Sequence, residues 1–251
     1  MKHTILSLLL LLFVAASCDK NDDPVNPGDH PIQYIDYCTI VGDGSGFLFH
    51  GDSSPLYIKI KTDPSPSLTQ FVEDGYHRAL ASFELPQSFD ASLINKVDTV
   101  VVKGAKLLSL MPLETHEVLS AAEADAAGVL SLDNTHPVTA MDATGCRGYI
   151  TVKGKYGYYV SNDDKTPVSV YMYVDESRCK SDVLALQLVY TREDIDGYDL
   201  LRYDTRTECF ALKSLKSRYG QLSNVTVEIR SRGNLLKTFK LLGSDFTSPL
   251  D

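Results

Sequence analysis

The sequence lacks the short motifs that mark most hydrolases, nucleotide-binding proteins and zinc proteins. No Gly-x-Ser-x-Gly elbow occurs, and there is no Cys-x-x-Cys pair or histidine-rich tract to hold zinc. The glycine-rich segment 42–46 is not followed by the Lys-Ser/Thr pair of a phosphate loop. The motifs therefore predict no catalytic site, no metal site and no cofactor, and we expect that the chain is not an enzyme.

Positive charge is also scarce. The net charge is -9 over 251 residues, and the densest basic cluster is Lys213, Lys216 and Arg218. Proteins that bind nucleic acid need many clustered Lys and Arg side chains to contact the phosphates. We therefore expect no nucleic-acid partner.

Long hydrophobic runs are missing too, and the short run at the N-terminus has the length of a signal peptide and not of a membrane-spanning helix. The apolar run 5–16 has twelve residues, whereas a membrane-spanning helix needs about 20. Lys2 precedes this run and the small residues Ala15-Ala16-Ser17 stand just before Cys18, which is the pattern of a signal peptide and resembles a bacterial lipobox. Residues 1–17 are therefore predicted to be a cleaved signal peptide, and Cys18 to carry a lipid that anchors the protein to a membrane.

The segment that follows Cys18 is acidic, rich in proline and almost free of apolar residues. Residues 18–31 cannot bury enough surface to fold, so they are predicted to form an extended tether. An acidic stretch at this place also resembles the surface-export signal of Bacteroidetes lipoproteins. The expected location is the cell envelope, with the lipid in the outer membrane and the body either periplasmic or exposed at the surface.

Four cysteines remain after Cys18, an even number in an oxidising compartment. Two disulfides are permitted, and a bridge among Cys146, Cys179 and Cys209 in the C-terminal half is the favoured arrangement. Cys38 stands in an apolar run typical of a strand, where a buried free thiol is an equal alternative.

The periodicity of the chain predicts an all-β protein, because long helices that alternate with strands are missing. Residues 32–112 contain five short strands separated by turn residues, which suits a small OB-like β-barrel. Gly104 lies near the middle of the last run, 97–111. A glycine there indicates a bulge or bend that lets one strand serve two parts of a curved sheet.

Residues 113–140 are predicted to form a helical and irregular connector, with one helix over residues 115–127 that ends at Gly128. Residues 141–251 then contain about seven strands with polar turns between them, the pattern of an antiparallel β-sandwich. Gly233-Asn234 is the predicted two-residue turn of its last hairpin.

This layout resembles the NigD-like lipoproteins of Bacteroidetes over nearly the whole mature chain. The signal, lipobox cysteine and acidic tether match, and the first β unit begins at Tyr34-Ile35-Asp36-Tyr37. Three further segments look like the start of that family's second domain and its later core strands: residues 134–152, residues 182–191 and Cys209-Phe210-Ala211-Leu212. The resemblance implies a bacteriocin-immunity role and supplies no catalytic residue.

The tyrosines are the candidate contact residues. Exposed tyrosines supply rigid, amphipathic contact area, and Tyr158 and Tyr159 beside Gly157 are the predicted ligand-contacting pair. The alternative is that most tyrosines are half-buried strand residues. The acidic segment 194–199 fails the EF-hand spacing, which leaves either a loose calcium cage or a plain acidic loop.

The predicted function is therefore binding at the cell envelope. We expect a lipid-anchored protein that captures an unknown protein or glycan partner, with a bacteriocin-immunity-like role as the specific form. The alternatives are a structural or accessory subunit of an envelope complex and a glycan-active enzyme.

Overall fold

The structure is a computed structural model that describes residues 31–251 except 43–45, 54–55, 62–65, 96–99, 162–163, 197 and 199. The predicted signal peptide, the lipidated Cys18 and all of the tether except Pro31 lie outside the described residues. Residues 31–251 form one compact unit. Within the described part of the chain, no helix has the length and apolar character needed to cross a bilayer.

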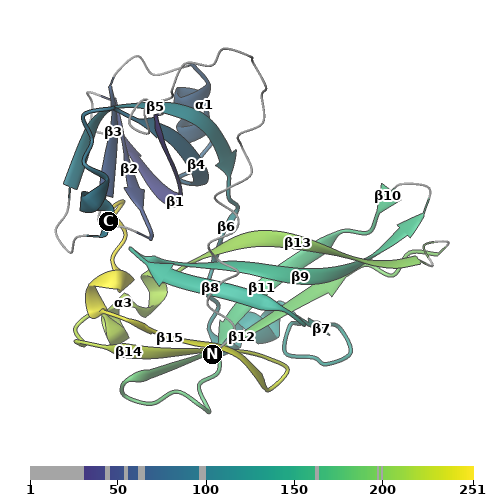
Figure 1. Cartoon of the computed structure of the whole chain (residues 1–251). Helices are drawn as coiled ribbons and strands as arrows, with labels where there is room; N and C mark the ends of the chain where they lie inside the picture. Colours follow the sequence, from purple (N-terminus) through teal and green to yellow (C-terminus); the bar gives the residue numbers. More distant parts are fainter. Residues whose placement is uncertain are drawn as a thin grey trace, which may run out of the picture. The chain divides into compact units, whose positions relative to one another are not determined.

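The N-terminal strands close into a five-stranded barrel (Figure 1), as predicted. The strand order is β1-β2-β3-β5-β4, with β1 hydrogen-bonded to both β2 and β4 and with β3 parallel to β5. Alternate apolar residues fill the interior, and Phe49 meets Phe83 edge to face at 5.0 Å. The strands are β1 (Ile32–Gly42), β2 (Gly46–Gly51), β3 (Leu56–Lys61), β4 (Arg78–Leu85) and β5 (Val100–Pro112).

Gly104 makes the bulge that its place in the sequence predicts. Its φ is +78°, and the register between β3 and β5 shifts there, since Lys59 pairs with Lys103 and Ile60 with Ala105. The first part of β5 pairs with β3 and the remainder, from Lys106 to Pro112, pairs with β4. One long strand therefore closes the barrel. Between β3 and β4 lies helix α1 (Pro66–Glu73), and a 3-10 helix, η2 (Ala91–Asn95), follows β4.

The connector differs from the prediction at its start. Residues Thr115–Glu117 form strand β6, and the helix α2 covers only Ala121–Ala126. Strand β6 pairs in parallel with β13, where Thr115 is opposite Cys209. This pairing with a strand that is distant in the sequence holds the β6 backbone in an extended conformation. Ser120 caps α2 in a capping box with Glu123, which fixes where the helix begins.

The second half is a sandwich of two sheets, as predicted. One sheet has the order β10-β9-β13-β6 with β8 on β9, and the other has the order β11-β12-β14-β15 with β7 on β12. Both inner faces supply one hydrophobic core, to which Ile150 and Phe210 come from the first sheet and Leu186 and Ile229 from the second. Two pairs are parallel, β6 with β13 and β12 with β14; the other pairs of these sheets are antiparallel.

The bounds of these strands are β7 (His136–Pro137), β8 (Met141–Cys146), β9 (Tyr149–Ser161), β10 (Asp164–Lys165), β11 (Val168–Val174), β12 (Val183–Arg192), β13 (Leu200–Ala211), β14 (Val225–Ser231) and β15 (Asn234–Leu241). Three short helical segments complete the chain: η3 (Lys213–Leu215), α3 (Lys216–Tyr219) and η4 (Gly243–Phe246).

The last hairpin turns one residue earlier than predicted. Asn234 is already in β15, and the two turn residues are Arg232 and Gly233, with φ of +48° and +85°. Positive φ at both central residues is the signature of a type I′ turn, which matches the twist of the flanking strands. Arg147 and Gly148 repeat this turn between β8 and β9, with φ of +50° and +84°.

Candidate functional site

The four cysteines that follow the predicted lipidation site are free in the structure. Cys38 and Cys209 are buried, and Cys146 and Cys179 are half-buried, so the predicted bridge among Cys146, Cys179 and Cys209 is not formed. Burial raises the pKa of the Cys38 thiol and raises that of Cys146 to about 12. Thiol–disulfide chemistry needs the thiolate, which burial suppresses at these two positions. Cys38 is the buried thiol that the alternative prediction describes.

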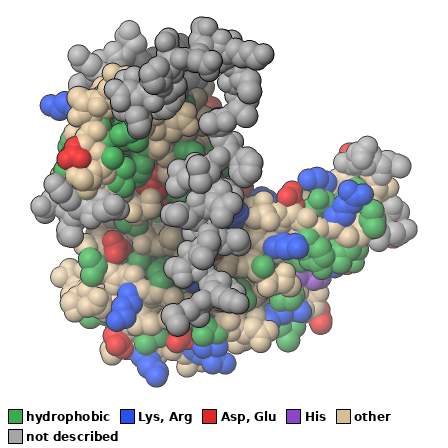
Figure 2. All heavy atoms as spheres, viewed as in Figure 1, with side chains coloured by type: hydrophobic (Ala, Val, Ile, Leu, Met, Phe, Trp, Pro, Cys, Tyr) green, Lys and Arg blue, Asp and Glu red, His purple; other side chains and the backbone are tan. Residues whose placement is uncertain are grey.

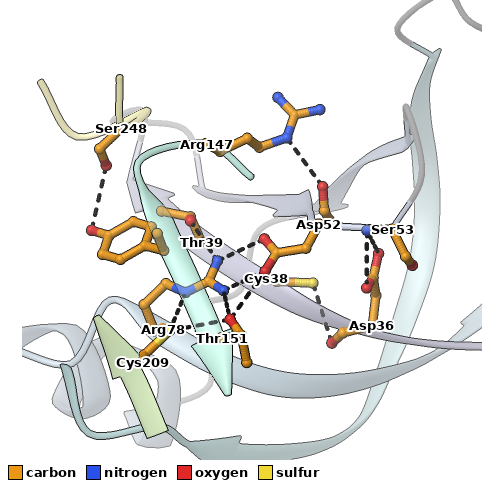
Figure 3. A network of polar contacts seen from close by, with 12 residues as sticks. Asp36, Cys38, Thr39, Asp52, Ser53, Arg78, Arg147, Thr151, Cys209 and Ser248 are labelled. Atoms are coloured by element: carbon orange, nitrogen blue, oxygen red, sulfur yellow. Dashed lines mark hydrogen bonds and ion pairs between the residues drawn. The ribbon is translucent and has the colours of Figure 1, made fainter. Parts of the chain in front are cut away.

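A buried arginine joins the barrel strands to the sandwich strands (Figure 3). The Arg78 guanidinium is fully buried, and its Nη1 donates to Asp52 Oδ1 at 2.8 Å and to Thr39 Oγ1 at 2.9 Å. From the sandwich, Thr151 Oγ1 accepts from Nη2 at 2.9 Å and Cys209 Sγ accepts from Nε at 3.3 Å.

This Arg78 network has further support at its edges. The ring of Tyr149 lies 4.7 Å from the guanidinium carbon, and Arg147 Nε donates to the Gly51 carbonyl at 3.1 Å. Each of the three guanidinium nitrogens of Arg78 therefore donates to an acceptor. We interpret the network as a structural joint, because its groups satisfy one another and leave little free to bind a ligand.

A second row of charged side chains lies along β13. Asp204, Arg206 and Glu208 stand at alternate positions, so their side chains share one face of the sheet. The Glu208 carboxylate is 2 % exposed, and its Oε2 lies 3.1 Å from His116 Nε2 on β6. Arg206 Nη2 lies 3.1 Å from Glu208 Oε1 in ion-pair range, but not in hydrogen-bonding geometry.

Two buried polar atoms, one in this row and one on the neighbouring strand, have no hydrogen-bond partner within the described part of the chain: Glu208 Oε1 and the hydroxyl of Tyr156 on β9. Burial, and then the nearby Glu208 carboxylate, raise the pKa of Tyr156 above its ordinary value. Gly154 makes room for this hydroxyl, since a Cβ there would lie 2.5 Å from it. Buried polar groups without partners are uncommon, and each one is a reason to look for a function.

A cavity of about 290 Å³ opens beside the Tyr156 ring. Tyr156 and the predicted contact residue Tyr158 line it, together with Lys165, Asp204 and Arg206. Lys165 Nζ lies 4.8 Å above the Tyr158 ring and 3.3 Å from Asp204 Oδ2. The cavity therefore combines two aromatic rings with charges of both signs.

The predicted pair Tyr158 and Tyr159 is half-buried, and cations cover both rings. The guanidinium of Arg192 lies 4.3 Å from the Tyr159 ring, and its Nη2 donates to the Tyr159 hydroxyl at 3.1 Å. Of this pair, Tyr158 lines the cavity beside Tyr156. Arg192 also pairs with Asp194 at 3.8 Å; the rest of the acidic segment includes Gly197 and Asp199, which lie outside the described residues.

Beyond Gly154, β9 pairs only with β13 and the two-residue β10 among the described strands. Residues 155–161 and 200–205 thus form a two-stranded segment, here termed the β9–β13 ribbon (Figure 1). Its exposed apolar side chains are Leu200 (54 % exposed), Leu201 and Tyr203 (50 % exposed). Figure 2 shows hydrophobic and Lys or Arg side chains gathered at the right of the view, where Figure 1 draws the ends of β9 and β13 near the label of β10.

Sequence reasoning missed His116, Glu208 and the exposed ribbon residues. His116 and Glu208 are far apart in the sequence, so no spacing motif connects them. A signal for the ribbon was present: Leu200-Leu201-Arg202-Tyr203 does not alternate, which is unusual for a strand with one buried face. The described residues include one group whose ligand atoms lie close enough together to hold a metal ion: Glu114, His116 and Glu208.

Comparison with known proteins identifies a shared fold. No family model matches the sequence, and no curated protein matches it. Solved structures do match, among them an uncharacterized protein from Parabacteroides merdae with a TM-score of 0.57 and 11 % identity, over 84 % of this chain and 99 % of that chain. A candidate lipoprotein from Bacteroides fragilis has a TM-score of 0.53 and 12 % identity, over 87 % and 100 % of the two chains.

The matching structures also include a NigD-like immunity protein from Bacteroides caccae, with a TM-score of 0.44 and 13 % identity over 85 % of this chain and 99 % of that chain. The two structures with a TM-score above 0.5, one of them the candidate lipoprotein, confirm the predicted resemblance to Bacteroidetes proteins at the level of the fold. At these identities the likeness concerns the fold and not the activity.

Proposed function

We propose that this chain is a lipid-anchored envelope protein that binds a partner protein through the β9–β13 ribbon, without catalysis. The observation that carries the proposal is the exposure of Leu200, Leu201 and Tyr203 on β13, at positions where β13 pairs with β9 alone among the described strands. Leu201 and Tyr203 share one face of the ribbon and Leu200 lies on the other, so both faces expose apolar area. Exposed apolar side chains of this kind are typical of surfaces that bind other proteins. The anchor would be a lipid on Cys18 in the outer membrane.

The chemistry of the ribbon favours a protein over a glycan. Three cations lie on tyrosine rings there, and one of them, Lys155, lies 5.4 Å above the exposed ring of Tyr203. Tyrosine and arginine are enriched where proteins bind proteins, and exposed leucines contribute apolar area that sugars do not match. The ribbon therefore suits a protein surface that presents apolar side chains bordered by carboxylates. An incoming toxin, which the resemblance to NigD-like proteins implies, is a partner of this class.

The test is cross-linking of the full-length protein in intact host cells, followed by purification and identification of what is bound. Leu200→Ser combined with Tyr203→Ser should reduce recovery of the bound protein at least tenfold. Leu242→Ser combined with Tyr76→Ser is a matched control, because Leu242 is also 54 % exposed and both residues lie outside the ribbon. Cys18→Ser should release the protein from the membrane fraction.

Equal recovery from the ribbon variant and the control variant would contradict the proposed surface. Melting temperatures near that of the unchanged protein are expected for both variants, since exposed apolar side chains contribute little to folding. A bound protein that remains in a stable one-to-one complex with both variants would instead support the role of an accessory subunit in an envelope complex.

A further inference from the structure

Three potential metal ligands meet where β6 lies beside β13. Glu114 immediately precedes β6 and His116 lies within it, and one ligand atom of Glu114 lies within 4.8 Å of one of His116. Thr115 pairs with Cys209, which places Glu208 beside them on the neighbouring strand. The Cys209 amide donates to the Glu114 carbonyl at 3.1 Å, so hydrogen bonds hold the two backbones in this register.

We propose that Glu114, His116 and Glu208 bind a divalent transition-metal ion of the Zn²⁺ class. One ligand atom from each residue lies within 4.8 Å of the others. His116 Nε2 and Glu208 Oε2 are only 3.1 Å apart. Zinc bonds of about 2.0–2.2 Å in a tetrahedral site separate neighbouring ligand atoms by roughly 3.4 Å, so this pair is close to the required spacing. The exposed Glu114 side chain can turn to close the remaining gap of at most about 1.4 Å.

The burial of Glu208 supports a cation at this place. The carboxylate is 2 % exposed, and one of its oxygens accepts no hydrogen bond within the described residues. A buried carboxylate is costly unless charge and hydrogen bonds compensate it. Arg206 is the neighbouring cation; its Nη1 donates to the Val168 carbonyl at 3.1 Å, and its Nη2 faces Oε1. Because Oε1 faces Arg206, an ion would bind Oε2 and take the place of the hydrogen bond that Oε2 shares with His116 Nε2 at 3.1 Å.

The donor set selects the class of metal. A neutral imidazole with two carboxylates suits Zn²⁺ and related transition ions, whereas Ca²⁺ and Mg²⁺ prefer oxygen ligands alone. Two carboxylates also cancel the charge of a divalent ion. The ring of Phe210 lies 5.5 Å from the imidazole of His116 and limits how that ligand turns.

Three protein ligands leave a fourth position open, as in zinc sites that exchange water or accept an outside ligand. Glu114 is exposed and His116 is partly exposed, so the open position is on the solvent side. This inference departs from the sequence-based expectation of no metal. It does not depend on the proposed binding role of the ribbon.

The test is equilibrium dialysis of the full-length, chelator-treated protein in detergent against ZnCl₂ alone. One ion per chain is expected, with a rise in melting temperature because the ion binds the folded state. His116→Ala and Glu208→Gln should each weaken binding by more than about 100-fold, since even residues that only support metal ligands commonly cost 10–100-fold. His136→Ala is the matched control. His136 is also a half-buried strand histidine, but its strand β7 pairs with β12 in the other sheet of the sandwich.

The exposed variant Glu114→Gln keeps the test decisive if replacement of buried Glu208 prevents folding. It should fold normally and weaken Zn²⁺ binding. Binding of Co²⁺ should give a visible spectrum without a thiolate charge-transfer band, which separates this site from the four cysteines. No stoichiometric binding, or binding that is unchanged by His116→Ala and Glu114→Gln, would overturn the proposal and leave His116 and Glu208 as an ion pair only.

Discussion

Arg78 and Glu208 are both buried charged side chains, but their surroundings differ. Each nitrogen of the Arg78 guanidinium donates to an acceptor, and the acceptors come from strands of both the barrel and the sandwich. Glu208 has one oxygen near His116 and one that accepts no hydrogen bond within the described residues. The first charge completes a closed network, whereas the second leaves bonding capacity unused.

The difference separates a structural charge from a candidate binding charge. A closed buried network fixes the relative placement of the groups that it joins, and removing one member leaves another charge without compensation. A partly satisfied group keeps the capacity to bind something else. The unused capacity beside Glu208 also adjoins the cavity and the exposed ribbon, because Arg206 contacts Glu208 and lines that cavity.

The largest expected effect is the loss of Arg78. Arg78→Met leaves the carboxylate of Asp52 buried without its counter-charge, and the free energy of unfolding should fall by about 3–5 kcal/mol. Urea unfolding followed by circular dichroism measures this change. Combining Arg78→Met with Asp52→Leu should restore much of the loss, because the unpaired charge is then removed as well. A loss below about 1 kcal/mol for Arg78→Met alone would show that the network does not hold the barrel strands to the sandwich strands.

A smaller effect is expected at Asp36, a neighbour of the Arg78 network (Figure 3). Burial raises the pKa of its carboxyl, with Asp52 adding to the rise, while hydrogen bonds from Tyr34 and Ser53 oppose it. A raised pKa in the folded state means that the folded protein binds the proton more tightly. The stabilising contribution is therefore complete below the unfolded pKa and is lost as the pH rises through the folded pKa.

Asp36→Asn removes this titration while keeping the shape of the side chain. The unchanged protein should lose stability relative to the variant as the pH rises above about 4, by about 1.4 kcal/mol for each unit by which the pKa is raised. Urea unfolding of both proteins between acid and neutral pH measures the difference. A difference that does not vary with pH, or that varies in the opposite sense, would contradict the raised pKa.

The strands were predictable because their signals are local. Alternating apolar residues and turn residues predicted the barrel and the sandwich, and Gly104 predicted the bulge in β5. Strand β6 was predicted as helix, because its extended form depends on pairing with β13, a partner that is distant in sequence. The same distance hid the meeting of His116 with Glu208. The cysteine count permitted bridges, but an even number carries no information on which thiols face one another.

The smallest expected effect, and the sharpest contrast with Arg78, is at Tyr156. Its hydroxyl is buried without a hydrogen-bond partner in the described residues, so Tyr156→Phe removes a group that costs free energy in the folded state. The free energy of unfolding should stay unchanged or rise by up to about 1 kcal/mol.

Tyr219→Phe is the matched control. Tyr219 is equally buried, but its hydroxyl donates to the Val183 carbonyl at 3.4 Å, so the loss of this hydroxyl should cost about 0.5–1.5 kcal/mol. Urea unfolding of the two variants side by side decides the matter. If Tyr156→Phe costs as much as Tyr219→Phe, the Tyr156 hydroxyl is satisfied in the free protein. If it costs nothing, this part of the sandwich retains an unused hydrogen-bonding group beside the cavity, as expected of a surface built to bind.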